Sequence, residues 1–209
     1  MAARIFPGKP EINVLPRLGP GEPVVYAAVT AGQGAREFLA ARLLETLAEL
    51  APQWARACAQ GTLVLDSGPL GQPLLLIGEE PGPSLSFSEA GGLLWAALTG
   101  RGQVGVDTAL EADFTPPYPY SRAFGREEWE WAWRHCQGQS AAAAALLWAA
   151  KEAAVKALGT GFHTTDPADL EVVPLGPAWG GLNLVVRAPQ AVNAWVRPLA
   201  EGWLGLAVV

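Results

Sequence analysis

The sequence predicts an α+β fold built from two halves that repeat one coarse pattern. Three observations support this prediction: β-like runs alternate with helical segments, the same order of elements occurs twice, and 50% of the 209 residues are hydrophobic. A core-forming chain of this length makes one larger domain or two small units that share an interface. We place the boundary near the turn at 100–103, between an N-terminal half (residues 1–102) and a C-terminal half (residues 103–209).

The first half is predicted to begin with a strand over residues 23–31. Gly32 and Gly34 then lead into residues 35–50, where apolar residues recur at steps of three and four, as in an amphipathic helix. A short helical segment is expected at 54–60. Three β-like pieces separated by Gly/Pro-rich turns complete this half, at residues 62–66, 73–77 and 93–98.

The second half is predicted to repeat this order. A strand ends at Asp107 and is expected to form a hairpin with the preceding strand through the turn Gly100 to Gly102. Helices follow at 124–136 and 140–158. The second helix contains an alanine run, 141–145, whose small side chains let a neighbouring element approach closely. The remaining strands are expected at residues 169–173, 182–187, 194–196 and 203–209.

Composition excludes several classes of function. Lys and Arg number 14 against 20 Asp and Glu, a net charge of −6, and no basic cluster offers the footprint that nucleic-acid binding requires. The first residues carry no secretory signal, and the longest apolar run, 141–150, is too short to span a bilayer. We therefore expect a cytoplasmic, monomeric protein without a membrane or nucleic-acid partner, in which Cys58 and Cys136 are reduced.

A carboxylate stands at the end of an apolar strand in Gly105-Val106-Asp107. A carboxylate at the mouth of a strand is placed to meet a cation or a ligand. Because an ordinary turn after a strand also favours aspartate, Asp107 alone does not decide between the two interpretations.

A second candidate lies near the end of the alanine-rich helix, where a long uncharged stretch gives way to Lys151, Glu152 and Lys156. Glu152 and Lys156 are four positions apart and share a face, whereas Lys151 is turned by about 100°. The alternative is a surface ion pair that contributes only a few tenths of a kcal/mol. The combination of this helix face with Asp107 favours a functional site.

Together these segments form a pattern that is similar to one family. Its members carry a G-[IV]-D segment at a strand end and, further along the chain, W-x-x-K-E-x-x-x-K-x-x-G-x-G on a helix. The matching segments here are Gly105 to Asp107, Trp148 to Gly161, Gly71-Gln72-Pro73, Ser86-Phe87-Ser88, and Phe124 to Glu128. The sequence resembles the Sfp-like 4′-phosphopantetheinyl transferases, as a divergent member.

The resemblance implies the pseudo-duplicated two-half fold of that family, with coenzyme A bound between the halves. It implies an enzyme that moves the 4′-phosphopantetheine group of coenzyme A onto a serine of an apo acyl or peptidyl carrier protein and releases 3′,5′-ADP. Mg²⁺ would be held on the pyrophosphate by Asp107 and Glu152, because magnesium takes oxygen ligands and keeps several waters.

The resemblance also implies roles for other side chains. Lys156, together with the metal, would offset charge on the leaving nucleotide, and Glu128, or a water that it orients, is the candidate base for the serine proton. Arg36, Ser86 and Ser88 are, with Lys156, candidate contacts to the phosphates of coenzyme A.

Three positions depart from the family pattern. Ala109 stands where a second acid usually follows G-[IV]-D, and the candidates to replace that acid are water and Glu111, two residues further on. Phe87 and Gln72 replace a histidine and a lysine that contact phosphate. Each loss is expected to weaken coenzyme A binding by roughly 1 to 3 kcal/mol.

Two other functions stay open because of these departures. A non-catalytic homologue with a decayed coenzyme A site would bind a carrier protein or another partner, and it would show no affinity for coenzyme A with or without Mg²⁺. A magnesium-dependent enzyme acting on another pyrophosphate ester would use the same two carboxylates.

Overall fold

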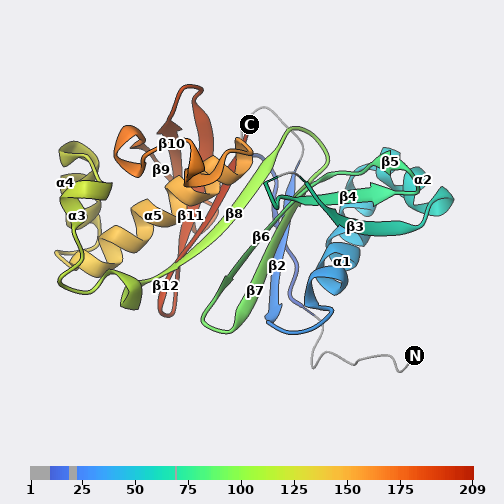
Figure 1. Ribbon diagram of the computed structural model, residues 1–209, viewed down its shortest axis with the longest axis horizontal. Coiled ribbons are helices and arrows are strands. Elements are labelled where there is room, and N and C mark those ends of the chain that lie inside the picture. Colours follow the sequence, from blue (N-terminus) through green and yellow to red (C-terminus); the bar gives the residue numbers. More distant parts are fainter. Residues whose placement is uncertain (1–9, 19–22, 69) are drawn as a thin grey trace.

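The computed structural model describes residues 10–18, 23–68 and 70–209 (Figure 1). Within these residues the chain forms three antiparallel sheets, and a long helix packs on each of the two larger ones. The predicted α+β class is confirmed. In the described part of the chain, no helix has both the length and the apolar character needed to cross a membrane.

The first large sheet belongs to the N-terminal half and has the strand order β1-β2-β7-β6. Its strands are β1 (Asn13–Leu15), β2 (Val24–Thr30), β6 (Ser84–Ala90) and β7 (Leu93–Thr99). Helix α1 (Ala35–Leu50) has the predicted bounds and packs on β2 and β7, with all of its leucines buried except Leu50 at its end.

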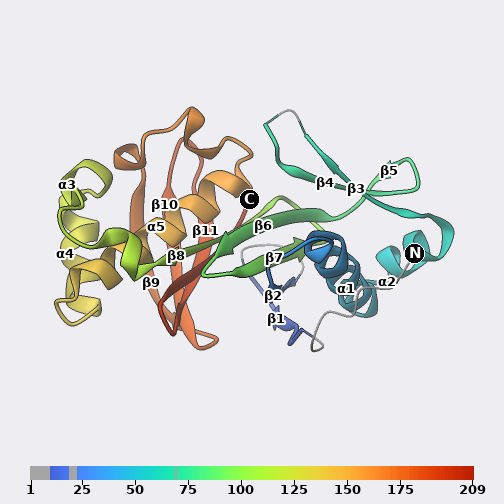
Figure 2. The same ribbon diagram turned by 60° about the horizontal axis from the view of Figure 1, so that its bottom comes forward.

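A small sheet with the order β3-β4-β5 extends the N-terminal half. Its strands are β3 (Leu63–Ser67), β4 (Pro73–Ile77) and β5 (Glu80–Pro81). Strand β5 and helix α2 (Pro52–Gln60) lie at the end of the molecule remote from the C-terminal sheet (Figure 1), whereas the turn between β3 and β4 lies near Lys156 and the residues after α5. The β3–β4 hairpin projects away from the large sheet (Figure 2), and its turn carries Gly71-Gln72-Pro73.

The second large sheet belongs to the C-terminal half and has the order β8-β12-β11-β10-β9. Its strands are β8 (Val104–Leu110), β9 (Glu171–Ala178), β10 (Gly181–Arg187), β11 (Val192–Leu199) and β12 (Gly202–Val208). Helix α5 (Ser140–Ala157) crosses one face, and the helices α3 (Tyr120–Ala123) and α4 (Arg126–His135) lie at the outer end (Figure 1). The two large sheets share one pairing. The strand that precedes the long helix pairs antiparallel with the strand that comes last in the sequence of that sheet: β2 pairs with β7, and β8 pairs with β12.

Glycine and alanine let α5 lie directly on β8 and β12. A Cβ atom on Gly105 would stand 1.9 Å from the carbonyl oxygen of Ala153, and one on Gly205 would stand 2.3 Å from that of Ala149. The alanines of α5 are buried against these strands, so the close approach expected from the alanine run is present. It places the C-terminal turns of α5 beside β8.

The two large sheets meet at their edge strands β6 and β8, which do not pair through their backbones. Instead, alternate N–H groups of β8 donate hydrogen bonds to serine hydroxyls of β6. The pairs are Val104 with Ser84 (3.0 Å), Val106 with Ser86 (3.1 Å) and Thr108 with Ser88 (3.1 Å). Side chains at alternate positions of a strand share a side, so all three serines face β8. We call this set the serine ladder.

The predicted hairpin at Gly100 to Gly102 is wrong. Strand β7 pairs with β2 and β6, whereas β8 pairs with β12, so β7 and β8 belong to different sheets. The hairpin instead joins β6 to β7 through Gly91 and Gly92, which both have positive φ angles that suit glycine. The turn at 100–102 carries the chain from one sheet to the other.

A shared apolar core joins the two large sheets. Tyr26 of β2 packs against Trp195 of β11, with ring centroids 5.9 Å apart. The guanidinium group of Arg197 lies over the rings of Tyr26 and Trp95, 5.5 and 5.7 Å from their centroids. These contacts hold the two sheets at a fixed separation, and the functional cleft lies between them.

Candidate active site between the two large sheets

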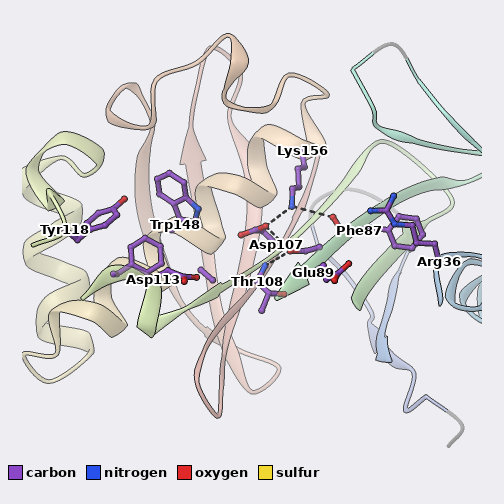
Figure 3. A pocket seen from close by; sticks show the side chains of 12 residues that line it. Arg36, Phe87, Glu89, Asp107, Thr108, Asp113, Tyr118, Trp148 and Lys156 are labelled. Atoms are coloured by element: carbon purple, nitrogen blue, oxygen red, sulfur yellow. Dashed lines mark hydrogen bonds and ion pairs between the residues drawn. The ribbon is translucent and has the colours of Figure 1, made fainter. Parts of the chain in front are cut away.

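A pocket of about 500 Å³ opens where β6, β8 and α5 meet (Figure 3). Its centre is ionic and contains Asp107 and Lys156. Arg36 and Phe87 lie at one end, and aromatic side chains, among them Trp148, lie at the other. The pocket therefore combines charged groups with an apolar wall.

A second pocket of about 280 Å³ adjoins the first. It shares Arg36, Phe87 and Lys156 with the first pocket and continues to Gln72 in the β3–β4 turn and to Thr160 after α5. The two pockets form one cleft, which both large sheets and the β3–β4 hairpin line.

Asp107 and Lys156 form an ion pair at the centre of this cleft. Lys156 Nζ donates to Asp107 Oδ1 at 2.7 Å and to the carbonyl oxygen of Val106 at 3.1 Å. Ser88 Oγ donates to the same carboxylate oxygen at 3.0 Å. Both side-chain donors thus bind Oδ1, and Oδ2 has no hydrogen-bond donor among the residues that the structure describes.

Helix α5 ends just beyond Lys156 in a glycine motif. Gly159 has a φ angle of 71°, its N–H donates to the carbonyl oxygen of Lys156, and the N–H of Thr160 donates to that of Val155. A left-handed glycine after a helix closes its last turn in this way. Gly159, the first glycine of the G-x-G segment, therefore ends α5 about one turn after Lys156.

Glu152 lies one turn before Lys156 on the same face of α5. Burial, and to a smaller extent the charge of Asp107, raises the pKa of Glu152 to about 7, and Lys156 opposes this shift. The negative charges of Asp107 and Glu152 repel each other, although Glu152 is not among the residues that line either pocket. A cation between them would relieve that repulsion.

This donor set fits one magnesium ion that also binds substrate oxygens. Asp107 and Glu152 offer carboxylate oxygens, and Mg²⁺ is usually held by one or two carboxylates together with substrate phosphates and water. Across residues 10–18, 23–68 and 70–209, no three His, Cys, Asp or Glu side chains converge into a metal cage.

The positions that depart from the family pattern have different surroundings. Ala109 is buried in the core of the C-terminal half and also borders the first pocket, two residues after Asp107. Phe87 lines both pockets, and the guanidinium group of Arg36 lies over its ring at 5.4 Å. Gln72 lines the second pocket only. Glu111 lines a separate pocket beside a half-buried cysteine, so it does not replace the acid missing at position 109.

Ser86 and Ser88 border the cleft, but their hydroxyls already have partners. Ser86 lines the second pocket and Ser88 the first. Both are buried and accept backbone N–H groups of β8 in the serine ladder. These bonds join the two sheets, and the predicted contacts of the serines with phosphate stay a prediction.

Glu128 lies outside the cleft, which contradicts its predicted role as the base. Its side chain is 0% exposed. Oε1 accepts hydrogen bonds from Lys151 Nζ at 2.5 Å and from the N–H of Gly125 at 2.8 Å, and Oε2 accepts one from the N–H of Val172 at 2.7 Å. A carboxylate enclosed in this way cannot reach the hydroxyl of a bound serine.

Lys151 points away from the cleft, as the helical spacing predicts. Its ammonium group also donates to the carbonyl oxygens of Ala123 at 3.0 Å and Pro167 at 2.8 Å. Burial lowers its pKa, and the charge of Glu128 offsets part of that shift. The Glu128–Lys151 pair therefore ties α5 to α4, to β9 and to the short helix η3 (Pro167–Asp169).

Two acidic residues of the cleft are missing from the sequence-based site. Glu89 at the end of β6 and Asp113 in the 3-10 helix η1 (Glu111–Phe114) line the same pocket as Asp107 (Figure 3). A strand continued beyond residue 110 would have put Glu111 on the face of Asp107. Because η1 begins at Glu111, the chain turns there and Asp113 borders the pocket instead.

The comparison with protein families agrees with this geometry. A family model described as the 4′-phosphopantetheinyl transferase superfamily matches residues 103–197. The chain carries a 4′-phosphopantetheinyl transferase superfamily domain. No curated protein matches the chain at a significant level. The resemblance found in the sequence is thus confirmed for the superfamily.

The phosphopantetheinyl transferase domain contains β8 and α5, and with them Asp107, Glu152 and Lys156. The other wall of the cleft, with Arg36 and Phe87, comes from residues before the matched range. The match supports a function of the phosphopantetheinyl transferase type.

Proposed function

We propose that this protein transfers the 4′-phosphopantetheine group of coenzyme A to a serine of an apo acyl or peptidyl carrier protein in the presence of Mg²⁺. The observation that carries the proposal is the Asp107–Lys156 ion pair in the cleft of a phosphopantetheinyl transferase superfamily domain, with Glu152 one turn before Lys156 on the same face of α5. Two carboxylates beside a lysine suit a pyrophosphate, which is bound best by a divalent cation and a positive side chain together.

The cleft accommodates coenzyme A with its pyrophosphate at the ionic centre. The second pocket, from Arg36 to Gln72 and Thr160, takes the nucleotide, and Arg36 is the exposed cation at its border with the first pocket. Arg36 therefore binds a nucleotide phosphate in this proposal. Ser86 and Ser88 lie along the same path, although their hydroxyls are shared with β8.

In the reaction, the carrier serine oxygen forms a bond to the β-phosphorus of coenzyme A as the bond from that phosphorus to the leaving 3′,5′-ADP breaks. The hydroxyl proton of the serine passes to solvent water. Negative charge grows on the leaving nucleotide, and Lys156 stabilises it by a charge-assisted hydrogen bond. Asp107 and Glu152 would hold Mg²⁺, which supplies charge neutralisation at the pyrophosphate when bound. Glu128 serves the fold of the domain and not the proton transfer.

Intact-protein mass spectrometry tests this proposal. A panel of apo carrier proteins is incubated with the full chain, coenzyme A and MgCl₂, with EDTA in place of MgCl₂ as the control. We expect at least one carrier to gain the mass of one phosphopantetheine group, and we expect EDTA to abolish the gain. Asp107→Ala and Glu152→Ala variants should give no product while keeping the far-UV circular dichroism of the wild type.

The opposite results identify the alternative. If no carrier gains mass and calorimetry detects no binding of coenzyme A with or without Mg²⁺, the protein is a non-catalytic homologue. If transfer occurs at wild-type rates in both alanine variants, the proposed metal site is wrong.

A further inference from the structure

We infer that Ser88 is a positioning residue that holds Asp107 with one carboxylate oxygen free for a metal ion. The inference rests on the proposed function, because it concerns the metal-binding carboxylate of the same site. It adds a contribution from the N-terminal half to a site whose proposed ligands all lie in the matched domain.

The Ser88 hydroxyl is engaged on both sides. It accepts the N–H of Thr108, the residue after Asp107, at 3.1 Å, and it donates to Asp107 Oδ1 at 3.0 Å. Because its oxygen is anchored to the backbone of β8, its proton points to a carboxylate on the same strand. Ser88 is only 8% exposed, so water does not readily replace it.

The geometry leaves Oδ2 as the available oxygen of Asp107. Ser88 and Lys156 both donate to Oδ1, and the described residues provide no donor for Oδ2. A metal-ligating carboxylate is commonly fixed by a hydrogen bond to its other oxygen, and loss of such a partner lowers metal affinity.

Lys156 cannot do this alone. Its side chain is 29% exposed, and its ammonium group is shared with the carbonyl oxygens of Val106 at 3.1 Å and Phe87 at 3.5 Å. An arriving phosphate attracts this ammonium group away from Asp107. Ser88 is neutral, so it stays on Asp107 when Lys156 turns to the phosphate.

The serine ladder provides a matched control. Ser84 accepts the N–H of Val104 at 3.0 Å, as Ser88 accepts that of Thr108, but its hydroxyl donates to Gln103 instead of Asp107. Removing the hydroxyl of Ser84 or of Ser88 therefore removes one hydrogen bond between β6 and β8. Only removal at position 88 also releases Asp107.

The test measures binding of coenzyme A to the full chain by calorimetry at a series of MgCl₂ concentrations. We expect Ser88→Ala to raise the Mg²⁺ concentration for half-maximal binding about tenfold. Ser84 borders the second pocket, so Ser84→Ala changes the affinity for coenzyme A itself but leaves this Mg²⁺ concentration within twofold of the wild type. Ser88→Cys, whose thiol is a weaker donor of similar size, should lie between them. Thermal unfolding without Mg²⁺ should shift by similar amounts in the two alanine variants.

Three outcomes are decisive. A raised Mg²⁺ requirement in Ser88→Ala but not in Ser84→Ala supports the inference. The inference is overturned, and the proposed function stays intact, if both alanine variants need the wild-type Mg²⁺ concentration or if both need a Mg²⁺ concentration raised by the same factor. If binding of coenzyme A to the wild type does not depend on Mg²⁺, the proposed function itself is contradicted.

Discussion

Lys156 Nζ lies 2.7 Å from Oδ1 of Asp107, although the two residues are 49 positions apart in the chain. This ion pair links the last turn of α5 to the middle of β8, because the strand continues to Leu110 and does not end at Asp107 as predicted. In the structure the ammonium group of Lys156 offsets the negative charge of Asp107. In the proposed function, the substrate pyrophosphate attracts Lys156 away from Oδ1 of Asp107, and Oδ2 would hold Mg²⁺.

Replacing this lysine should remove activity but not the fold. We expect Lys156→Met to lower kcat/KM for transfer by at least about 100-fold, since a preorganised donor to developing charge contributes roughly 3 kcal/mol. Lys156 is partly exposed, and the buried Asp107 keeps the hydrogen bond from Ser88, so the free energy of unfolding should fall by about 1–2 kcal/mol, less than for a fully buried pair. Steady-state kinetics and urea unfolding measure the two effects.

The neighbouring lysine of the same helix should behave in the opposite way. Lys151→Met leaves Glu128 buried without its cation, which is expected to cost roughly 3–5 kcal/mol of unfolding free energy. At temperatures where the variant is folded, it should still bind coenzyme A. Equal losses of stability in Lys151→Met and Lys156→Met would contradict the separate roles given to the two lysines.

The sequence predicts the helices well because their signals are local. The apolar spacing of α1 and the composition of α5 depend only on neighbouring residues, and the bounds agree within one residue. Strand β6 has no such signal, because its alternate serines face the neighbouring sheet and interrupt the apolar pattern. The β7–β8 hairpin fails for another reason: a turn motif does not specify which strand a strand will pair with.

The site shows the same division. Helical spacing separates Lys156, which lines the cleft, from Lys151, which lies in the core. The motif match also singles out Glu128, but matching letters carry no information on burial. Asp113 is not predicted from the sequence. The turn at η1 brings it to the pocket, and no residue pattern indicates that turn.

The closest contact between α5 and β8 gives a second kind of prediction. Gly105→Ala places a methyl group against the carbonyl oxygen of Ala153, which forces α5 away from β8. We expect a loss of roughly 1–3 kcal/mol in unfolding free energy and a larger proportional loss of transfer activity, because Asp107 separates from Glu152 and Lys156. Gly32→Ala is the control, since its new Cβ would meet nothing within 4 Å. Unaltered activity in Gly105→Ala would show that the site does not need this contact.

The acids of η1 should differ although they are two residues apart. Asp113 lines the cleft with Asp107, whereas Glu111 lines a different pocket. Removing a negative charge from the cleft weakens its attraction for a cation, so Asp113→Asn should raise the Mg²⁺ concentration needed for half-maximal transfer severalfold. Glu111→Gln should leave it unchanged. The measurement is the initial rate of transfer against MgCl₂ concentration, and a larger effect from Glu111→Gln would reverse the assignment.

Gln72 offers a gain-of-function test. It lines the second pocket, beyond Arg36, at the position where the family pattern has a lysine. A cation there would add a charge-assisted contact to the nucleotide phosphates, so Gln72→Lys should tighten coenzyme A binding by about 1 kcal/mol, or roughly fivefold in Kd. Gln190→Lys, in the exposed turn between β10 and β11, adds the same charge away from the cleft and should have no effect. Calorimetry at low and high salt compares the two variants. If both tighten binding equally, the gain comes from the overall charge of the protein; if only Gln72→Lys does so, and the gain falls at high salt, the nucleotide lies in the second pocket.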